Sequence, residues 1–399
     1  MADDSVRTDA DTARAQLASH GWVSRRSEAF RHLPPPALEQ WLHQPGDEPT
    51  GSGWTVQDGG ASAALSVQRL SALDAQQRAQ LLAGLPHPGD GEAAPFAWAH
   101  RALCTEGLRL NVRGAAAQRL HLHHHSRSAA EAPLLVLDVE EGAHCTLLET
   151  HAFAPQAAQN LQVHIRLARG ARLQHLRVVD AGAGDRIAHH VHATLAADAH
   201  YQQATVATAA AYHLQRGTLA LQGTGAQADT ATLALAGGDG HQIDQQAWTR
   251  MDAPRTRSSV ETLALAQHGA HAVANAHTRI APGADEAAVR QRLAGIPLAG
   301  NPRLVLRPHL EILHDNVQAA HGATWGALPE DALFYARQRG LEEASARALI
   351  IEGMARALLE RSLGAQPEGA LMLAQWLDGG WLARAIATHL VPETRARHG

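Results

Sequence analysis

A recurring Gly-Ala pair is the strongest constraint on the fold of this 399-residue chain. The pair occurs at Gly114, Gly142 and Gly170 with a spacing of 28 residues, and again at Gly225, two periods later within one residue. Between the pairs lie short runs that alternate apolar and polar residues, at 108–112, 120–123, 134–139, 161–167 and 173–179. Alternation with a period of two is typical of β-strands. A fixed period of this length, with small residues at the corners, indicates stacked coils.

The sequence therefore predicts a mainly β fold, with a right-handed parallel β-helix at 107–313 flanked by N-terminal and C-terminal α-helical regions. Aromatic residues make up only 4% of the chain, and Ala, Val and Leu are abundant, which suits a narrow interior where small side chains stack. An ordinary β-sandwich also has recurring strands and remains the alternative fold. A sandwich does not, however, require a 28-residue register.

The two flanking regions show helical patterns instead of the alternating runs. Residues 1–106 mix short helical patterns with breaks rich in Pro and Gly and are expected to be mostly helical. In 314–399 a helical period returns: a first helix spans 328–340, with Pro and two acidic residues at its start and Gly340 at its end. Two further helices are expected around 349–358 and 376–390, the last weakened by the Gly379-Gly380 pair.

Composition excludes several functional classes. All 34 basic residues are Arg, so a P-loop lysine, a Schiff-base lysine and the protein-kinase lysine are absent. The net charge of −5 gives no electrostatic footprint for nucleic acid. No apolar run is long enough to span a membrane, and the acidic start lacks the apolar segment of a secretory signal. We therefore expect a cytoplasmic protein with neither a nucleic-acid nor a membrane partner.

Histidine is unusually frequent, with 27 residues, several of them clustered. His121, His123 and His125 fall on one face of an expected strand, where two could share a metal as in cupins. The supporting Glu of a cupin is missing, so a solvent-facing polar row is the preferred interpretation, and it extends to the cluster at 189–192. Neither a G-x-S-x-G nor an H-E-x-x-H motif occurs, and no catalytic residue is assigned. Buried thiols are expected at Cys104 and Cys145.

Residues 308–340 carry a long, position-specific motif, PHLEILHDNVQAAHGATWGALPEDALFYARQRG. This segment closely resembles the signature of the SufB/SufD family, the scaffold subunits of the SUF iron–sulfur cluster assembly system. Weaker similarity extends to 24–31, to 95–103 and to 281–284. Where many relatives have Cys-Ser before the His of the motif, this chain has Ala319-Ala320, so His321 alone remains as a potential ligand. The length and the scarcity of cysteine favour the SufD branch over the SufB branch.

The resemblance implies a non-catalytic scaffold in a SufBC2D-type complex that assembles iron–sulfur clusters, with a possible part in iron acquisition. It implies pairing with SufB through the β-helices and binding of the SufC ATPase through the C-terminal helical domain. His321 would bind iron or a transient cluster at the SufB interface, and the chain would have no ATP site of its own. The implied SufC contacts are Leu328, Leu333, Phe334, Tyr335 and Arg339. A homodimer is compatible with the resemblance when SufB is absent.

The alternative function is a β-helix enzyme or a histidine–metal enzyme that acts on a small molecule or a polysaccharide. The lack of paired acids and the scarcity of aromatic rings, on which sugars stack, argue against it.

Overall fold

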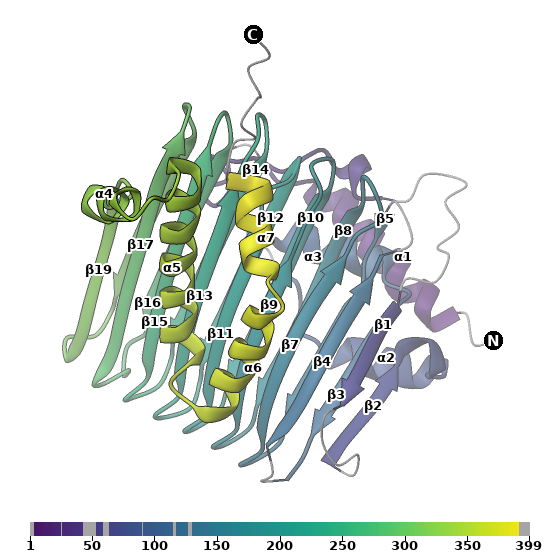
Figure 1. The fold of residues 1–399 in the computed structure, drawn as a ribbon. Coiled ribbons are helices and arrows are strands. Elements are labelled where there is room, and N and C mark those ends of the chain that lie inside the picture. Colours follow the sequence, from purple (N-terminus) through teal and green to yellow (C-terminus); the bar gives the residue numbers. More distant parts are fainter. Residues whose placement is uncertain are drawn as a thin grey trace.

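The chain alternates between two sheets as it advances (Figure 1). The computed structural model describes residues 4–24, 26–42, 53–58, 64–89, 91–114, 117–126 and 130–390. Sheet A consists of β1 (Gly53–Asp58), β4 (Gln118–His125), β7 (His144–Ala152), β9 (Arg172–Val179), β11 (His200–Thr208), β13 (Gln227–Ala236), β15 (Arg257–Gln267), β17 (Ala287–Ala299) and β19 (Val317–Trp325), in that order. Sheet B runs from β2 (Leu65–Arg69) through β3 (Gly107–Val112), β6 (Leu134–Val139), β8 (Ala158–Leu167), β10 (Arg186–Leu195), β12 (Tyr212–Leu221), β14 (Gln242–Met251) and β16 (His271–Ile280) to β18 (Arg303–Ile312), with β5 (Ala130–Glu131) beside β8.

From β3 onward, each circuit of the chain adds one parallel strand to each sheet, which confirms the predicted parallel β-solenoid. Its right-handed winding stays a prediction. The first turn differs, because β1 and β2 pair antiparallel with β4 and β3. The N-terminal region therefore contributes two strands to the sheets in addition to its helices.

The predicted 28-residue register appears as a corner with a left-handed backbone in successive turns. The angle φ is 65° at Gly142, 63° at Gly170 and 74° at Gly225, where glycine avoids the steric cost of a Cβ. Asp198, with φ of 58°, occupies the same corner in the turn where the Gly-Ala pair is missing. The residue after each corner is a fully buried alanine: Ala143, Ala171, Ala199 and Ala226.

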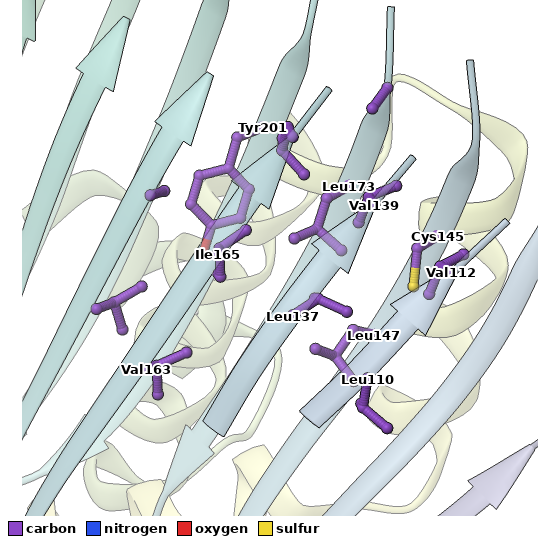
Figure 2. Packing of buried hydrophobic residues seen from close by; sticks show 14 of the residues in the cluster. Leu110, Val112, Leu137, Val139, Cys145, Leu147, Val163, Ile165, Leu173 and Tyr201 are labelled. Atoms are coloured by element: carbon purple, nitrogen blue, oxygen red, sulfur yellow. The ribbon is translucent and has the colours of Figure 1, made fainter. Parts of the chain in front are cut away.

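Inward-facing side chains stack in columns along the solenoid (Figure 2). Leu110 aligns with Leu137, and Leu137 aligns with Ile165, so that successive turns bury one another. Such interlayer burial stabilises the fold by about 25 cal/mol per Å² of apolar surface removed from water. Cys145 lies in this core, where burial raises the pKa of its thiol to about 12. Both cysteines are buried, as predicted.

Helices cover both sheets. At the N-terminal end are α1 (Asp4–His20), α2 (Ala75–Ala83), α3 (Ala94–Leu103) and the short 3-10 turns Leu38–Gln40 and Leu70–Ala72; α3 packs on β8 of sheet B. At the C-terminal end are α4 (Glu330–Gln338), α5 (Glu343–Leu363), α6 (Pro367–Asp378) and α7 (Trp381–Leu390). The last three lie across sheet A (Figure 1) and share an apolar core with it. None of the described helices is long and apolar enough to cross a membrane.

Two C-terminal expectations need correction. The solenoid does not end at residue 313, because 317–325 forms β19 in register with β17, and the helical region starts at Glu330 rather than at 314. The inward positions of β19 include Ala and His instead of large aliphatic residues, so the sequence does not show the alternation of apolar and polar residues that is typical of a strand. The expected helix over 376–390 is two helices, because the chain turns at Gly379 and at Gly380, where φ is 67°.

Candidate functional site: the open end of the solenoid

The last turn of the solenoid is open. β18 and β19 are the terminal strands of their sheets, and within the described residues each pairs with a neighbour on one side only. An unpaired strand edge presents backbone N–H and C=O groups in the geometry that another strand needs. The end of the molecule at β19, on the left in Figure 1, therefore offers two edges for pairing.

His321 lies on the inward-facing column of this turn. In the register it aligns with Gln291 of β17, and its neighbours Ala319 and Ala323 align with Val289 and Leu293. These three β17 residues are buried, whereas His321, Ala319 and Ala323 are exposed because no further turn stacks on them. The imidazole thus occupies an interior position of the solenoid while remaining accessible from its open end.

Apolar side chains surround this edge. Trp325 at the end of β19 is 61% exposed. Ile312, the last residue of β18, and Leu313, which follows it, are also among the exposed large hydrophobic residues. These side chains all belong to the last turn, so they add exposed apolar surface to the open end.

The expected SufC contacts divide into two groups. Leu328 and Leu333 pack into the core shared by the C-terminal helices and sheet A. Phe334 is 66% exposed and Tyr335 is 60% exposed. Arg339 lies over the Tyr335 ring at 4.9 Å from its centroid and donates a hydrogen bond to its hydroxyl. Helix α4 projects beside β19 and contacts α5 (Figure 1), so the outer group faces away from the core.

The two histidine clusters differ in their burial. His121 and His123 are half-buried on the outer face of β4. The Thr150 hydroxyl oxygen lies 3.0 Å from His121 Nε2 and 2.9 Å from His123 Nδ1. The polar row there is confirmed. The extension of that interpretation to 189–192 is wrong, because His189 and His190 are fully buried. Among the described residues, no three His, Cys, Asp or Glu side chains are placed to hold a metal ion.

Sequence reasoning missed a polar network inside the solenoid. The buried Glu149 carboxylate accepts hydrogen bonds from His151 Nε2 at 2.7 Å and from His175 Nε2 at 2.9 Å. Arg177 donates to it from Nε at 3.1 Å and from Nη2 at 2.8 Å. His189 continues the network, with its Nδ1 at 3.3 Å from Arg177 Nη2. Inward positions of β7, β9 and β10 bring these groups together, and only the 28-residue spacing of Glu149 and Arg177 could have linked them.

Charge pairing decides the ionisation of this network. Burial raises the pKa of Glu149, but the Arg177 charge and the hydrogen bonds from His151 and His175 outweigh that effect and hold the pKa well below its usual range. Burial also lowers the pKa of both histidines, which keeps them neutral donors near neutral pH. A fully paired carboxylate has no free lone pair to act as a base, so the network holds the interior together rather than offering a catalytic group.

Residues 122–354, more than half of the chain, match the family described as "SUF system FeS cluster assembly, SufBD core domain". The chain belongs to the SufB/SufD family. The match runs from β4 through the open end into α5, so it includes His321 and helix α4.

Individual relatives agree with this membership. An iron–sulfur cluster assembly SufBD family protein of Synechocystis is 27% identical over 253 residues, which cover 60% of this chain and 55% of the relative. The iron–sulfur cluster assembly protein SufD of Escherichia coli is 37% identical over 76 residues, 18% of each chain. SufB of Bacillus subtilis is 29% identical over 133 residues, 33% of this chain and 28% of that protein. The chain thus spans about half the length of the Synechocystis relative and less of the other two.

Proposed function

We propose that the chain is a non-catalytic, SufD-like scaffold subunit of a SufBC2D-type complex that assembles iron–sulfur clusters. One observation carries the proposal: the open end of the solenoid has two unpaired strand edges, and one of them, β19, exposes an inward-facing histidine, His321. A second β-solenoid of the SufB type would pair with these edges and bring its own ligands to the same place. Family membership supports that kind of partner.

In this proposal iron or a nascent cluster is the cargo. Neutral imidazole is a suitable ligand for iron. His321 supplies one ligand, and the partner supplies the others, since the described part of the chain has no three-ligand group of its own. A site divided between two subunits can open and close when the subunits rotate. The SufC-type ATPase would supply that motion by binding the exposed face of helix α4.

The test compares two histidine variants in the complex co-expressed with its SufB-type and SufC-type partners. We expect His321→Ala to leave the complex assembled, because the exposed side chain supports no core, and to reduce the iron and sulfide recovered with it severalfold. His123→Ala is the matched control, since it removes an outward-facing histidine far from the open end. Co-elution measures assembly, and metal and sulfide analysis measures the cargo.

Equal cluster recovery from wild type and His321→Ala in an intact complex would contradict the ligand role. Equal losses in both variants would indicate non-specific metal binding by a histidine-rich chain. Failure of the wild-type chain to co-elute with its partners would contradict the scaffold role itself.

A further inference from the structure

A cavity of about 470 Å³ lies on the opposite side of the molecule from the C-terminal helices. Its floor is the outer face of sheet B, from β8 to β14, and its wall is formed by residues 85–88 and 91–94 with the following turns of α3. Its volume falls within the range typical of small-molecule sites. The cavity is distant from the open end and is not part of the function proposed above.

Arginine is the most frequent charged residue in the described lining of the cavity. Arg101, Arg216 and Arg250 line it from three separate elements, α3, β12 and β14. Glu92 is the one carboxylate that the described lining contributes, and its two oxygens accept hydrogen bonds from the backbone N–H groups of Glu28 at 2.6 Å and Ala29 at 2.8 Å. Arg250 Nη2 also donates a hydrogen bond to Asp252 Oδ2 at 2.9 Å, so one of the three guanidinium groups already faces a carboxylate. The remaining positive charge of the described lining favours an anion in this space.

One of these arginines is held in place before any ligand arrives. The Arg216 guanidinium lies over the Trp248 ring at 4.8 Å from its centroid and donates from Nη1 to Gln246 Oε1. Trp248 is in turn stacked on His277, with ring centroids 4.4 Å apart. A guanidinium fixed on one side keeps its other N–H donors in a defined direction, which lowers the entropy cost of binding.

Buried imidazoles complete the lining. His190 is 2% exposed, and its Nε2 has no hydrogen-bond partner among the residues that the structure describes. The same holds, within the described residues, for the buried Nδ1 of His164, whose ring stacks on His192 at 5.0 Å. A buried polar atom without a partner is destabilising, so the fold retains these groups at an energetic disadvantage. A ligand with hydrogen-bonding oxygens would remove that disadvantage.

These imidazoles do not form a metal site, because no three described His, Cys, Asp or Glu side chains have the necessary arrangement. The combination of guanidinium groups with neutral imidazole donors is instead suited to phosphate oxygens, which accept several charge-assisted hydrogen bonds at once. We propose that this cavity binds a small molecule through its phosphate groups, at a site formed by Arg216, Arg250 and His190.

Pyrophosphate is the direct probe, since it presents two linked phosphate groups and no other chemistry. Isothermal titration calorimetry on the full chain is expected to show saturable, one-to-one binding. Arg216→Gln and Arg250→Gln should each weaken binding at least tenfold, because each removes a charge from the lining. Arg250 is the safer variant for folding, since its side chain is 57% exposed. Arg119→Gln, on the exposed outer face of sheet A, is the matched control and should bind like wild type.

Thermal unfolding provides a second measurement. A ligand that binds only the folded chain raises its melting temperature, and the increase should be smaller in Arg250→Gln than in Arg119→Gln. Two results would overturn the proposal: no saturable binding of pyrophosphate up to millimolar concentration, or the same affinity in wild type and both cavity variants. Equal stabilisation by sodium chloride at matched ionic strength would also overturn it, because that effect needs no specific site.

Discussion

Polar side chains buried in the interior of the solenoid are paired with one another. Arg177 and Glu149 are completely buried, yet Glu149 accepts hydrogen bonds from Arg177, His151 and His175. Arg177 also donates to Gln215 Oε1 at 3.0 Å. Removing one partner of such a pair leaves an uncompensated charge in the interior, which typically costs about 3–5 kcal/mol. The network therefore restricts which side chains this layer of the solenoid accepts.

Buried histidines make the fold sensitive to acid. Burial lowers the pKa of His213 to about 4, against an opposing effect of its hydrogen bond to the Thr208 carbonyl, and burial likewise lowers the pKa of His100 to about 4. A histidine in the unfolded chain has a pKa of about 6.5. Between these pH values the unfolded chain binds protons that the folded chain excludes, so the free energy of unfolding should fall as the pH falls from about 6.5 to about 4. Urea unfolding at a series of pH values measures the slope.

The variant His213→Asn isolates one of these groups. Asn retains a donor near the position of His213 Nδ1, which lies 2.5 Å from the Thr208 carbonyl oxygen, but it does not titrate. The slope should decrease by up to about 1.4 kcal/mol per pH unit, the contribution of one proton. His125→Asn, at an exposed position of β4, controls for loss of an imidazole and should keep the wild-type slope. A slope unchanged in His213→Asn would contradict the assignment.

The sequence could not distinguish buried from exposed histidines, although it located the strands that carry them. Residues at even and odd positions of a solenoid strand face opposite sides, but the outer side is itself covered in places. His189 faces the lumen, and His190 faces outward yet lies under Phe96 of α3, with ring centroids 5.1 Å apart. Two adjacent polar residues can therefore both be buried, and a pattern of alternation alone cannot reveal it.

At the scale of elements, the corner residues were the most predictable feature. The Gly-Ala pairs marked the corner for two reasons. A left-handed backbone favours glycine at the corner, and the next residue is buried in a space that admits only a small side chain. In three other turns the corner residue is Asp198, Arg255 or Glu286, with φ between 54° and 58°. These corners lack glycine, so the Gly-Ala pattern did not reveal them. Strand β19 was not predicted because its inward positions 319, 321 and 323 hold Ala, His and Ala. At an open end no further turn packs on these positions, so they need no large side chains.

Helix α4 gives a prediction at this scale. Phe334 is 66% exposed and supports no described core, so Phe334→Ala should leave the circular dichroism spectrum and melting temperature unchanged. If α4 binds the SufC-type ATPase, the variant should weaken that complex by about 2 kcal/mol or more, since aromatic anchors dominate many interfaces. Titration calorimetry with the ATPase measures the affinity.

Leu349→Ala is a suitable control for that experiment, because Leu349 on α5 is also an exposed large hydrophobic residue of the C-terminal helices. Wild-type affinity in Phe334→Ala, with an intact fold, would place the ATPase elsewhere. Equal weakening in both variants would indicate a broad apolar contact rather than an anchor at Phe334.

At the scale of the whole molecule, the two ends of the solenoid are treated differently. The first turn is closed by antiparallel strands, and Trp54 of β1 packs inside against His124 with ring centroids 4.8 Å apart. The last turn has no such cover within the described residues, and Trp325 of β19 is exposed. Both ends present strand edges, but only the last turn leaves its inward column uncovered, so we expect the open end to be the preferred surface for pairing.

This asymmetry predicts self-association when the SufB-type partner is absent, because two open ends can pair around a two-fold axis. Sedimentation equilibrium of the isolated chain should show a dimer that dissociates on dilution. Ala323→Arg places a charge on the inward column of β19 and should yield a monomer with an unchanged circular dichroism spectrum, since Ala323 is exposed. Thr55→Arg changes an exposed residue on β1, the edge strand of the same sheet at the closed end, and should remain dimeric. A wild-type chain that is monomeric at all concentrations, or a dimer that survives Ala323→Arg but not Thr55→Arg, would show that the open end is not the surface through which this solenoid pairs.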